Sequence, residues 1–249
     1  MDSNNVQEGT LSKFISVFKP MWLAVVATFA LLISPWSYAQ PALNAKQQAV
    51  IPIAAFTASG DIDKLKISLA QGLDQGLTIN EIKEVIAQLY AYAGFPRSLN
   101  GLAAFMQVLE TRKASGIVDQ FGPESKPLPS DKTSLEFGSD NQTRLIGREV
   151  KGALFDFSSQ IDTYLKSHLF GDIFQRDLLS WKLREIATIA ALANMSGVNS
   201  QLAAHYNISM NNDVSRQELQ QFIAILQRAC GAAVAQNAEQ VLTAVLAQK

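Results

Sequence analysis

Apolar residues recur three and four positions apart along most of the chain, and no segment sustains the period-two alternation of a half-buried strand. Two of these apolar series follow a capping box, in which a Ser or Thr and a Glu three residues later satisfy the first amides of a helix. The boxes are Thr78–Glu81 and Ser215–Glu218. The apolar positions behind them are Ile82, Val85, Ile86 and Leu89 in the first case, and Leu219, Phe222, Ile223 and Leu226 in the second. The pattern predicts an all-α fold.

The two capping boxes lie 137 positions apart, and the same shift places Gly94 on Gly231 and Asn100 on Asn237. Several matches at one constant offset indicate an internal duplication. The alternative is two unrelated amphipathic helices with common caps. We predict one repeat over residues 48–112 and a second over residues 151–249. Residues 113–150, rich in Gly, Pro, Ser and charged residues, are predicted to be the linker.

Residues 1–39 have the order of segments that is typical of a secretory signal peptide. Lys13 and Lys19 precede an uncharged run over residues 21–33, which as a helix would span roughly 20 Å, less than the ~30 Å hydrocarbon core of a membrane. A small-x-small site then ends at Ala39. We expect cleavage after Ala39, a periplasmic or otherwise exported mature protein, and no stable membrane span after cleavage. An uncleaved N-terminal membrane anchor is the alternative.

Composition excludes several functional classes. The 21 Lys and Arg residues balance 22 Asp and Glu residues, so the chain lacks the basic character of a nucleic-acid-binding protein. One cysteine rules out an intramolecular disulfide, and two histidines leave little material for a His-based metal site. The chain also has no Gly-rich phosphate loop and no Gly-x-Ser-x-Gly motif. We therefore predict neither a metal nor a cofactor.

The segment AQLYAYAGFPRSLNGLAAF, residues 87–105, strongly resembles the carboxymuconolactone decarboxylase family, and LREIATIAALANMSGVNSQLAAH, residues 183–205, resembles the other half of the family pattern. The resemblance covers roughly residues 48–112 and 161–246. It implies a duplicated, all-helical fold shared with alkylhydroperoxidase D-like proteins. Those proteins assemble as trimers of two-repeat chains or as hexamers of one-repeat chains.

The chain departs from the peroxidase branch of that fold, which carries Cys-x-x-Cys just ahead of a His and a Glu one helix earlier. Val198 and Gln201 stand at the two cysteine positions, so disulfide exchange is not available here. Glu185 and His205 stand at the Glu and His positions, whereas Ser68 stands at the His position of the first copy. Only the second copy retains the polar pair, and a composite pocket between the copies is plausible.

The candidate catalytic residues are Glu185 and His205. A carboxylate on an Ala- and Ile-rich helix needs a partner, and Glu185 would orient the imidazole of His205 as a general acid or base. The alternative is a purely structural hydrogen bond, between Glu185 and either His205 or Arg184, that holds two helices together. The lone cysteine, Cys230, is interpreted as a buried apolar residue rather than a nucleophile.

The candidate substrate-binding residues are Arg97, Arg184 and Tyr90. Either arginine would bind a substrate carboxylate through two parallel hydrogen bonds, and the alternative is simple solvation at the surface. Tyr90 and Tyr92 lie two positions apart and point to different faces of a helix, so at most one of them faces a given pocket. Core packing is the alternative for both tyrosines.

Two functional hypotheses follow. The first is an acid–base enzyme of decarboxylase or lactone type that acts on a small organic acid or lactone. The second is a non-catalytic exported binding or assembly module. A further alternative is peroxiredoxin-type antioxidant activity, as in the peroxidase branch. Because each repeat is small, we also expect apolar faces around Phe105, Leu109 and Ala187 to contact other subunits of a homo-oligomer, three chains being the form that the resemblance implies.

Overall fold

The computed structural model describes residues 42–248, and the predicted signal peptide lies outside this range. Residues 42–248 form helices, turns and extended connections, with no strand among them. This confirms the predicted all-α class. No helix within this range is long and apolar enough to cross a membrane.

The duplication predicted from the sequence is present in the helices. The first copy consists of α2 (Ala45–Ser59), α3 (Ile62–Asp74), α4 (Ile79–Ala93) and α5 (Phe95–Ala114). The second copy consists of α9 (Trp181–Ala193), α10 (Asn199–Asn211), α11 (Arg216–Cys230) and α12 (Ala232–Leu246). A shift of 137 residues places α3 on α10 and α4 on α11 with identical bounds, and α5 and α12 begin at equivalent residues.

Local sequence signals explain these shared bounds. The side chains of Thr78 and Ser215 accept hydrogen bonds from the backbone amides of Glu81 and Glu218. In return, each glutamate carboxylate accepts a hydrogen bond from the backbone amide of its cap residue, as the two capping boxes predict. Helices α4 and α11 both end at a glycine with positive φ, 82° at Gly94 and 94° at Gly231. Only glycine adopts that conformation without strain, so α5 and α12 start directly after the turn.

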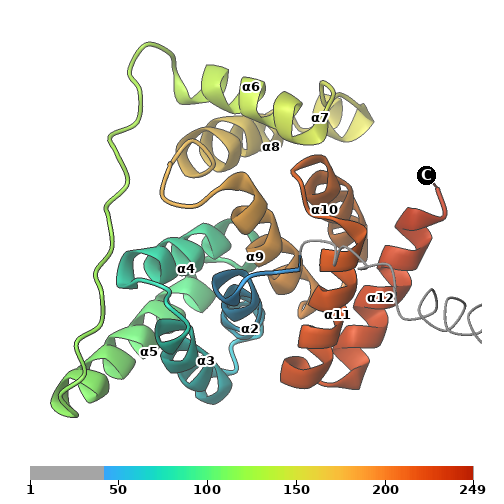
Figure 1. Ribbon diagram of the computed structural model, residues 1–249. Helices are drawn as coiled ribbons and strands as arrows, with labels where there is room; N and C mark the ends of the chain where they lie inside the picture. Colours follow the sequence, from blue (N-terminus) through green and yellow to red (C-terminus); the bar gives the residue numbers. More distant parts are fainter. Residues whose placement is uncertain (1–41, 249) are drawn as a thin grey trace, which may run out of the picture. The chain divides into compact units, whose positions relative to one another are not determined.

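Helices α2 and α9 pack against each other at the centre of the molecule (Figure 1). Both are apolar around most of their circumference, as a helix buried on all sides must be. The other helices repeat their contacts about this pair: α11 packs on α2 as α4 packs on α9, and α3 adjoins α2 as α10 adjoins α9. Each central helix is therefore covered by a helix of its own copy and by a helix of the other copy.

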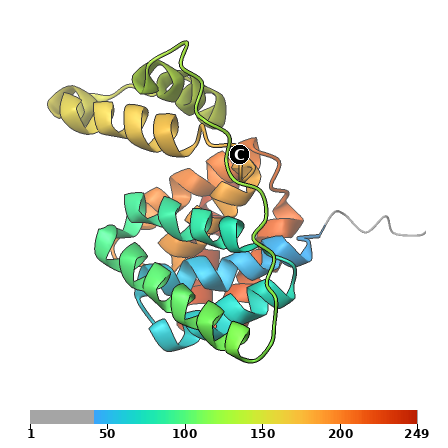
Figure 2. The same cartoon turned by 90° about the vertical axis from the view of Figure 1, so that its left-hand side faces the viewer.

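A helical layer over residues 134–173 precedes the second copy and lies at one end of the helical bundle, where α6 contacts α10 (Figure 2). It contains α6 (Ser134–Ile146), α7 (Ala153–Phe157), α8 (Ser159–Tyr164) and the π-helix η1 (Leu165–Ile173). Glycines allow α6 and η1 to approach closely: a Cβ atom at Gly138 would collide with the carbonyl of Lys166, and one at Gly171 with the carbonyl of Ser134. The layer has its own small core, formed by Leu145, Leu169, Phe170, Ile173, Phe174 and Ile208.

The segment predicted as a linker, residues 113–150, contains a helix in its second half. Residues 117–130 do run without helix, but α6 follows, beginning at a third capping box, Thr133–Glu136, and ending at Gly147. The positions that α6 buries have helical spacing: Gly138, Asn141, Gln142 and Leu145. Only Leu145 among them is a large apolar residue, so the periodic apolar signal was missing.

The expected subunit-facing surfaces also differ. Phe105 is 2% exposed and Ala187 is 0% exposed, because both lie in the core of the chain, and Leu109 is partly buried against that core. The exposed apolar side chains of α5 are instead Phe95, Leu99 and Met106. Helix α5 thus presents these exposed apolar side chains on a different face from the one containing Phe105.

Candidate functional site

Glu185 and His205 form the hydrogen-bonded pair that the sequence predicts. Nδ1 of His205, on α10, lies 2.8 Å from Oε2 of Glu185, on α9. Glu185 is completely buried, and the His205 side chain retains 11% of its surface. Because an ionised carboxylate only accepts hydrogen bonds, the Nδ1 atom carries the hydrogen. In the neutral imidazole Nε2 then keeps its lone pair and is a general base, and in the imidazolium Nε2 carries a proton and is a general acid.

Tyr92, a residue of the first copy, contacts the Glu185–His205 pair of the second copy. Its ring, on α4, meets the imidazole of His205 edge to face, with 5.5 Å between ring centres. Burial, together with the nearby charge of Glu185, raises the pKa of the Tyr92 hydroxyl well above its ordinary value. The hydroxyl therefore stays protonated and remains a hydrogen-bond donor at any physiological pH.

Two buried polar atoms of this site have no hydrogen-bond partner among the described residues. They are Oε1 of Glu185 and the Tyr92 hydroxyl oxygen, which lies near Thr188 without a hydrogen bond of normal geometry, while the Thr188 hydroxyl is bonded to Gln88 and to the carbonyl of Arg184. An unsatisfied buried polar group costs about 1–3 kcal/mol, so it calls for a specific explanation. A site that binds a polar ligand gives one, because the ligand supplies the missing partners. Glu185, His205 and Tyr92 are from here on called the acid–base site.

Arg184, beside Glu185 on α9, belongs to a buried polar network and also interacts electrostatically with Tyr92. Its guanidinium donates to Glu84 at 2.7 Å, to Oε1 of Gln88 at 2.9 Å and to the carbonyl of Arg176 at 3.0 Å. Arg176 in turn bonds both carboxylate oxygens of Glu84. Burial lowers the pKa of Arg184, while Glu84 opposes that shift. Burial also disfavours the charged form of Glu84, but the bonds from the two arginines outweigh it and lower the pKa of Glu84.

The model of the carboxymuconolactone decarboxylase family matches residues 25–107 and again residues 160–244, together more than half of the chain. The chain belongs to this family. The paired match also reproduces the duplication seen in the helices. No curated protein sequence matched the chain.

The match to the carboxymuconolactone decarboxylase family has two further consequences. It covers Tyr92 in its first segment and Glu185 and His205 in its second, so the acid–base site joins both family repeats. Its first segment begins at residue 25, inside the predicted signal peptide.

Not every predicted site residue joins the acid–base site of this family member. Arg184 is 0% exposed, and both of its terminal nitrogens bond protein groups, whereas its Nε has no partner among the described residues. Arg97 is exposed and its guanidinium lies against Gly60, at the turn after α2. Tyr90 stacks on Phe95 at 4.3 Å and contacts His168. Of the two tyrosines, it is Tyr92 that reaches His205.

Sequence reasoning missed the network around Glu84. Glu84 and Gln88 lie four residues apart on α4, inside an otherwise apolar helical face, and both are buried. A carboxylate and an amide at that spacing within a buried face indicate a polar partner on the facing helix. This signal was available in the sequence, but the identity of the partner helix was not.

The two positions that hold the cysteine pair in the peroxidase branch carry no thiol in this chain. Val198 is partly buried at the start of α10, and Gln201 is exposed one turn later. Burial raises the pKa of the Cys230 thiol to about 11, so that the thiolate is scarce at neutral pH. Within residues 42–248 no three His, Cys, Asp or Glu side chains gather closely enough to hold a metal ion.

Proposed function

We propose that this protein is an acid–base enzyme that acts on a small carboxylated or lactone-like compound at the site formed by Glu185, His205 and Tyr92. The observation that carries the proposal is the buried Glu185–His205 hydrogen bond beside two buried polar atoms without partners. A pair that served only to join two helices would not need the unsatisfied Tyr92 hydroxyl next to it.

The residues suit a decarboxylation. The bond between carbon and the carboxylate breaks, CO₂ leaves, and the electron pair enters a conjugated carbonyl as an enolate. The Tyr92 hydroxyl donates a hydrogen bond to the enolate oxygen, which stabilises the charge that develops there. Protonated His205, stabilised by Glu185, delivers a proton to carbon, and the proton is replaced from solvent. The net reaction consumes one proton and releases one CO₂.

The histidines offer a matched test. His168 pairs with Asp172 through Nδ1 at 2.8 Å, as His205 pairs with Glu185, but both partners are largely exposed. Decay of the carboxymuconolactone after which the family is named should be followed by ultraviolet absorbance with the wild type, H205Q and H168Q. We expect H205Q to lower kcat by roughly 10²-fold or more and H168Q to leave it unchanged. Equal rates for wild type and H205Q would remove the proposal.

A non-catalytic binding module is the second candidate. The small exposed fraction of His205, 11% of its side chain, favours it, because little of the ring is open to a substrate. The two candidates separate in the same assay with a panel of small aromatic and lactone acids. Saturable binding that depends on His205, without turnover of any acid, would favour the module.

We further propose that the protein is exported and assembles from three chains. Phe95, Leu99 and Met106 support association: each exposes about 60% of its surface (62%, 59% and 62%) on one helix, α5. Burying such side chains against another subunit is favourable at about 25 cal/mol per Å² of apolar area. The number three comes from the family resemblance, and the compartment from residues 1–39.

A further inference from the structure

The acid–base site has a counterpart related by the duplication. The acid–base site is built by α9, α10 and α4. At the offset of 137 residues, the equivalent helices of the opposite copies are α2 for α9, α3 for α10 and α11 for α4. At the counterpart, Gln48 replaces Glu185, Ser68 replaces His205 and Ala229 replaces Tyr92. We call the space between α2, α3 and α11 the counterpart pocket.

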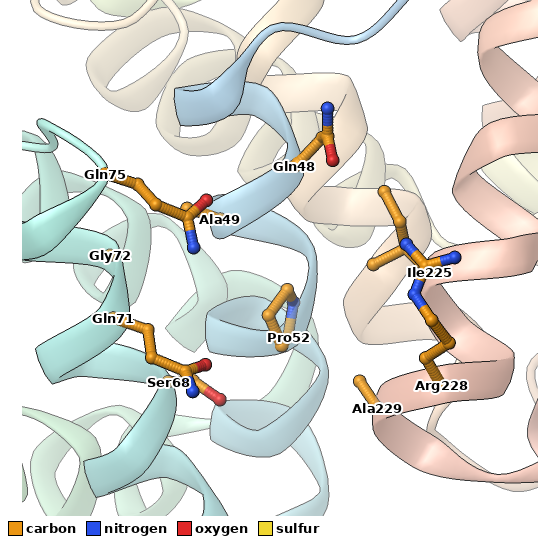
Figure 3. A pocket seen from close by; sticks show the side chains of 10 residues that line it. All are labelled: Gln48, Ala49, Pro52, Ser68, Gln71, Gly72, Gln75, Ile225, Arg228 and Ala229. Carbon is orange, nitrogen blue, oxygen red and sulfur yellow. The ribbon is translucent and has the colours of Figure 1, made fainter.

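Loss of the two rings leaves the counterpart pocket hollow. In the acid–base site the rings of Tyr92 and His205 pack edge to face. In the counterpart pocket the same positions hold the methyl group of Ala229 and the hydroxymethyl group of Ser68, and a cavity of about 300 Å³ opens there. Figure 3 shows the Gln71 and Gln75 side chains extending from α3 toward α2, with Arg228 on α11 at the other side of Pro52. This volume is at the lower end of the range for ligand pockets, which suits a small molecule.

The lining of this pocket favours an anion. It contains the guanidinium of Arg228 and no carboxylate. Arg228 makes no ion pair within residues 42–248, and the side-chain amides of Gln71 and Gln75 make no hydrogen bond there either. Arg228 is exposed on α11, across α2 from Gln71 and Gln75, and a guanidinium without an ion pair binds a carboxylate through two parallel hydrogen bonds. Pro52, on the pocket wall, cannot donate the helical amide bond to the Gln48 carbonyl, so an acceptor is also present.

We propose that the counterpart pocket is a second binding site, distinct from the acid–base site, for a small organic acid. The carboxylate binds Arg228, the amides of Gln71 and Gln75 bond its polar groups, and the hydrocarbon part lies against Pro52, Ile225 and Ala229. The two copies of the duplicated chain have thus diverged, one retaining an acid–base pair and the other opening a pocket.

Isothermal titration of the full-length protein tests this site, with benzoate and succinate as probes and the neutral benzamide and succinamide as controls. We expect at least one acid to saturate the protein below roughly 10 mM, with its amide about tenfold weaker or worse, because a charged hydrogen bond is lost. R228Q should weaken the acid by about tenfold or more. The matched control is R216Q, an exposed arginine on the same helix outside the pocket.

Two more variants assign the binding to the correct copy. A229Y refills the pocket with the ring found at the equivalent position of the acid–base site, and should abolish binding while the thermal melt shows a folded protein. E185Q should leave this binding unchanged, so failure of the proposed enzyme and failure of this site are distinguishable. The proposal is overturned if neither acid binds, if acid and amide bind alike, or if R228Q and R216Q have the same affinity.

Discussion

Replacing Arg184 with methionine tests the energetic role of the buried network between the two copies. Arg184 has no exposed surface, and its guanidinium bonds Glu84, Gln88 and the carbonyl of Arg176. Methionine is unbranched and flexible, so it fills most of the same volume without charge. The substitution therefore removes the hydrogen bonds and leaves packing nearly intact.

The structure sets the expected magnitude. Breaking a buried ion pair by removing one partner costs about 3–5 kcal/mol, because the remaining charge loses its compensation. Glu84 keeps Arg176, which bonds both of its carboxylate oxygens at 2.8 and 3.0 Å, so its charge stays partly compensated. We therefore expect the lower end, about 3 kcal/mol. For a chain of this size that corresponds to a fall in Tm of roughly 6–12 °C.

Arg176→Met is the matched control, because Arg176 bonds the same carboxylate from a position that is 41% exposed. Because Arg176 is partly exposed, water can replace much of the hydrogen bonding to Glu84 that R176M removes. We therefore expect R176M to lower the free energy of unfolding by about 1 kcal/mol or less. Urea unfolding followed by circular dichroism gives both free energies. If R176M destabilises the protein as much as R184M does, burial does not set the strength of this network and the reasoning is refuted.

The same carboxylate predicts a pH dependence of stability. The pKa of Glu84 is lower in the folded chain than its ordinary value of 4.5. The stabilisation of the fold by ionised Glu84 is therefore complete above about pH 4.5, its pKa in the unfolded chain. It is lost as the pH falls through the lower pKa of Glu84 in the folded chain. E84Q should be less stable than the wild type at neutral pH, and the difference should shrink on acidification below pH 4.5.

Four further predictions concern the site, the thiol, the leader and the assembly. Tyr92→Phe should lower kcat on the order of 10²-fold, because it removes the hydroxyl that would stabilise the enolate. The free energy of unfolding should stay constant or rise by up to about 1 kcal/mol, since the lost hydroxyl is buried and has no hydrogen bond of normal geometry. A clear loss of stability would argue for a structural role of Tyr92. With Val198 and Gln201 at the cysteine positions and Cys230 at a pKa of about 11, we expect no peroxide reduction driven by a dithiol donor; such turnover by the purified protein would contradict this. Mass spectrometry of protein recovered from cells should show cleavage after Ala39, whereas an intact N-terminus in the membrane fraction would indicate an anchor. Light scattering of the mature protein should give three times the chain mass, and a monomer at micromolar concentration would exclude the proposed ring.

Local interactions explain why so much of the helical framework was predictable. A capping box, an apolar period and a terminal glycine act within a few residues, so Thr78–Glu81 and Ser215–Glu218 mark the starts of α4 and α11 in any tertiary setting. The duplication was predictable for the same reason, since these local signals recur at one offset. Helix α6 escaped prediction because the face it buries is mostly polar and glycine, with only Leu145 giving an apolar signal.

The contacts of the site were decided by tertiary structure, apart from the Glu185–His205 pair that the family pattern indicated. The sequence placed Tyr90 and Tyr92 on different faces of one helix, but the packing of α4 on α9 determined that Tyr92 meets His205. Likewise, the sequence alone shows Arg184 only as a cation next to Glu185. It is the contact with Glu84 and Gln88 from the other copy that makes Arg184 part of a buried network. The counterpart pocket also depends on tertiary structure, because its walls include Ser68 and Ala229, which are 161 positions apart in the sequence. Side-chain partners across helices depend on how the helices cross, and no local interaction encodes that crossing.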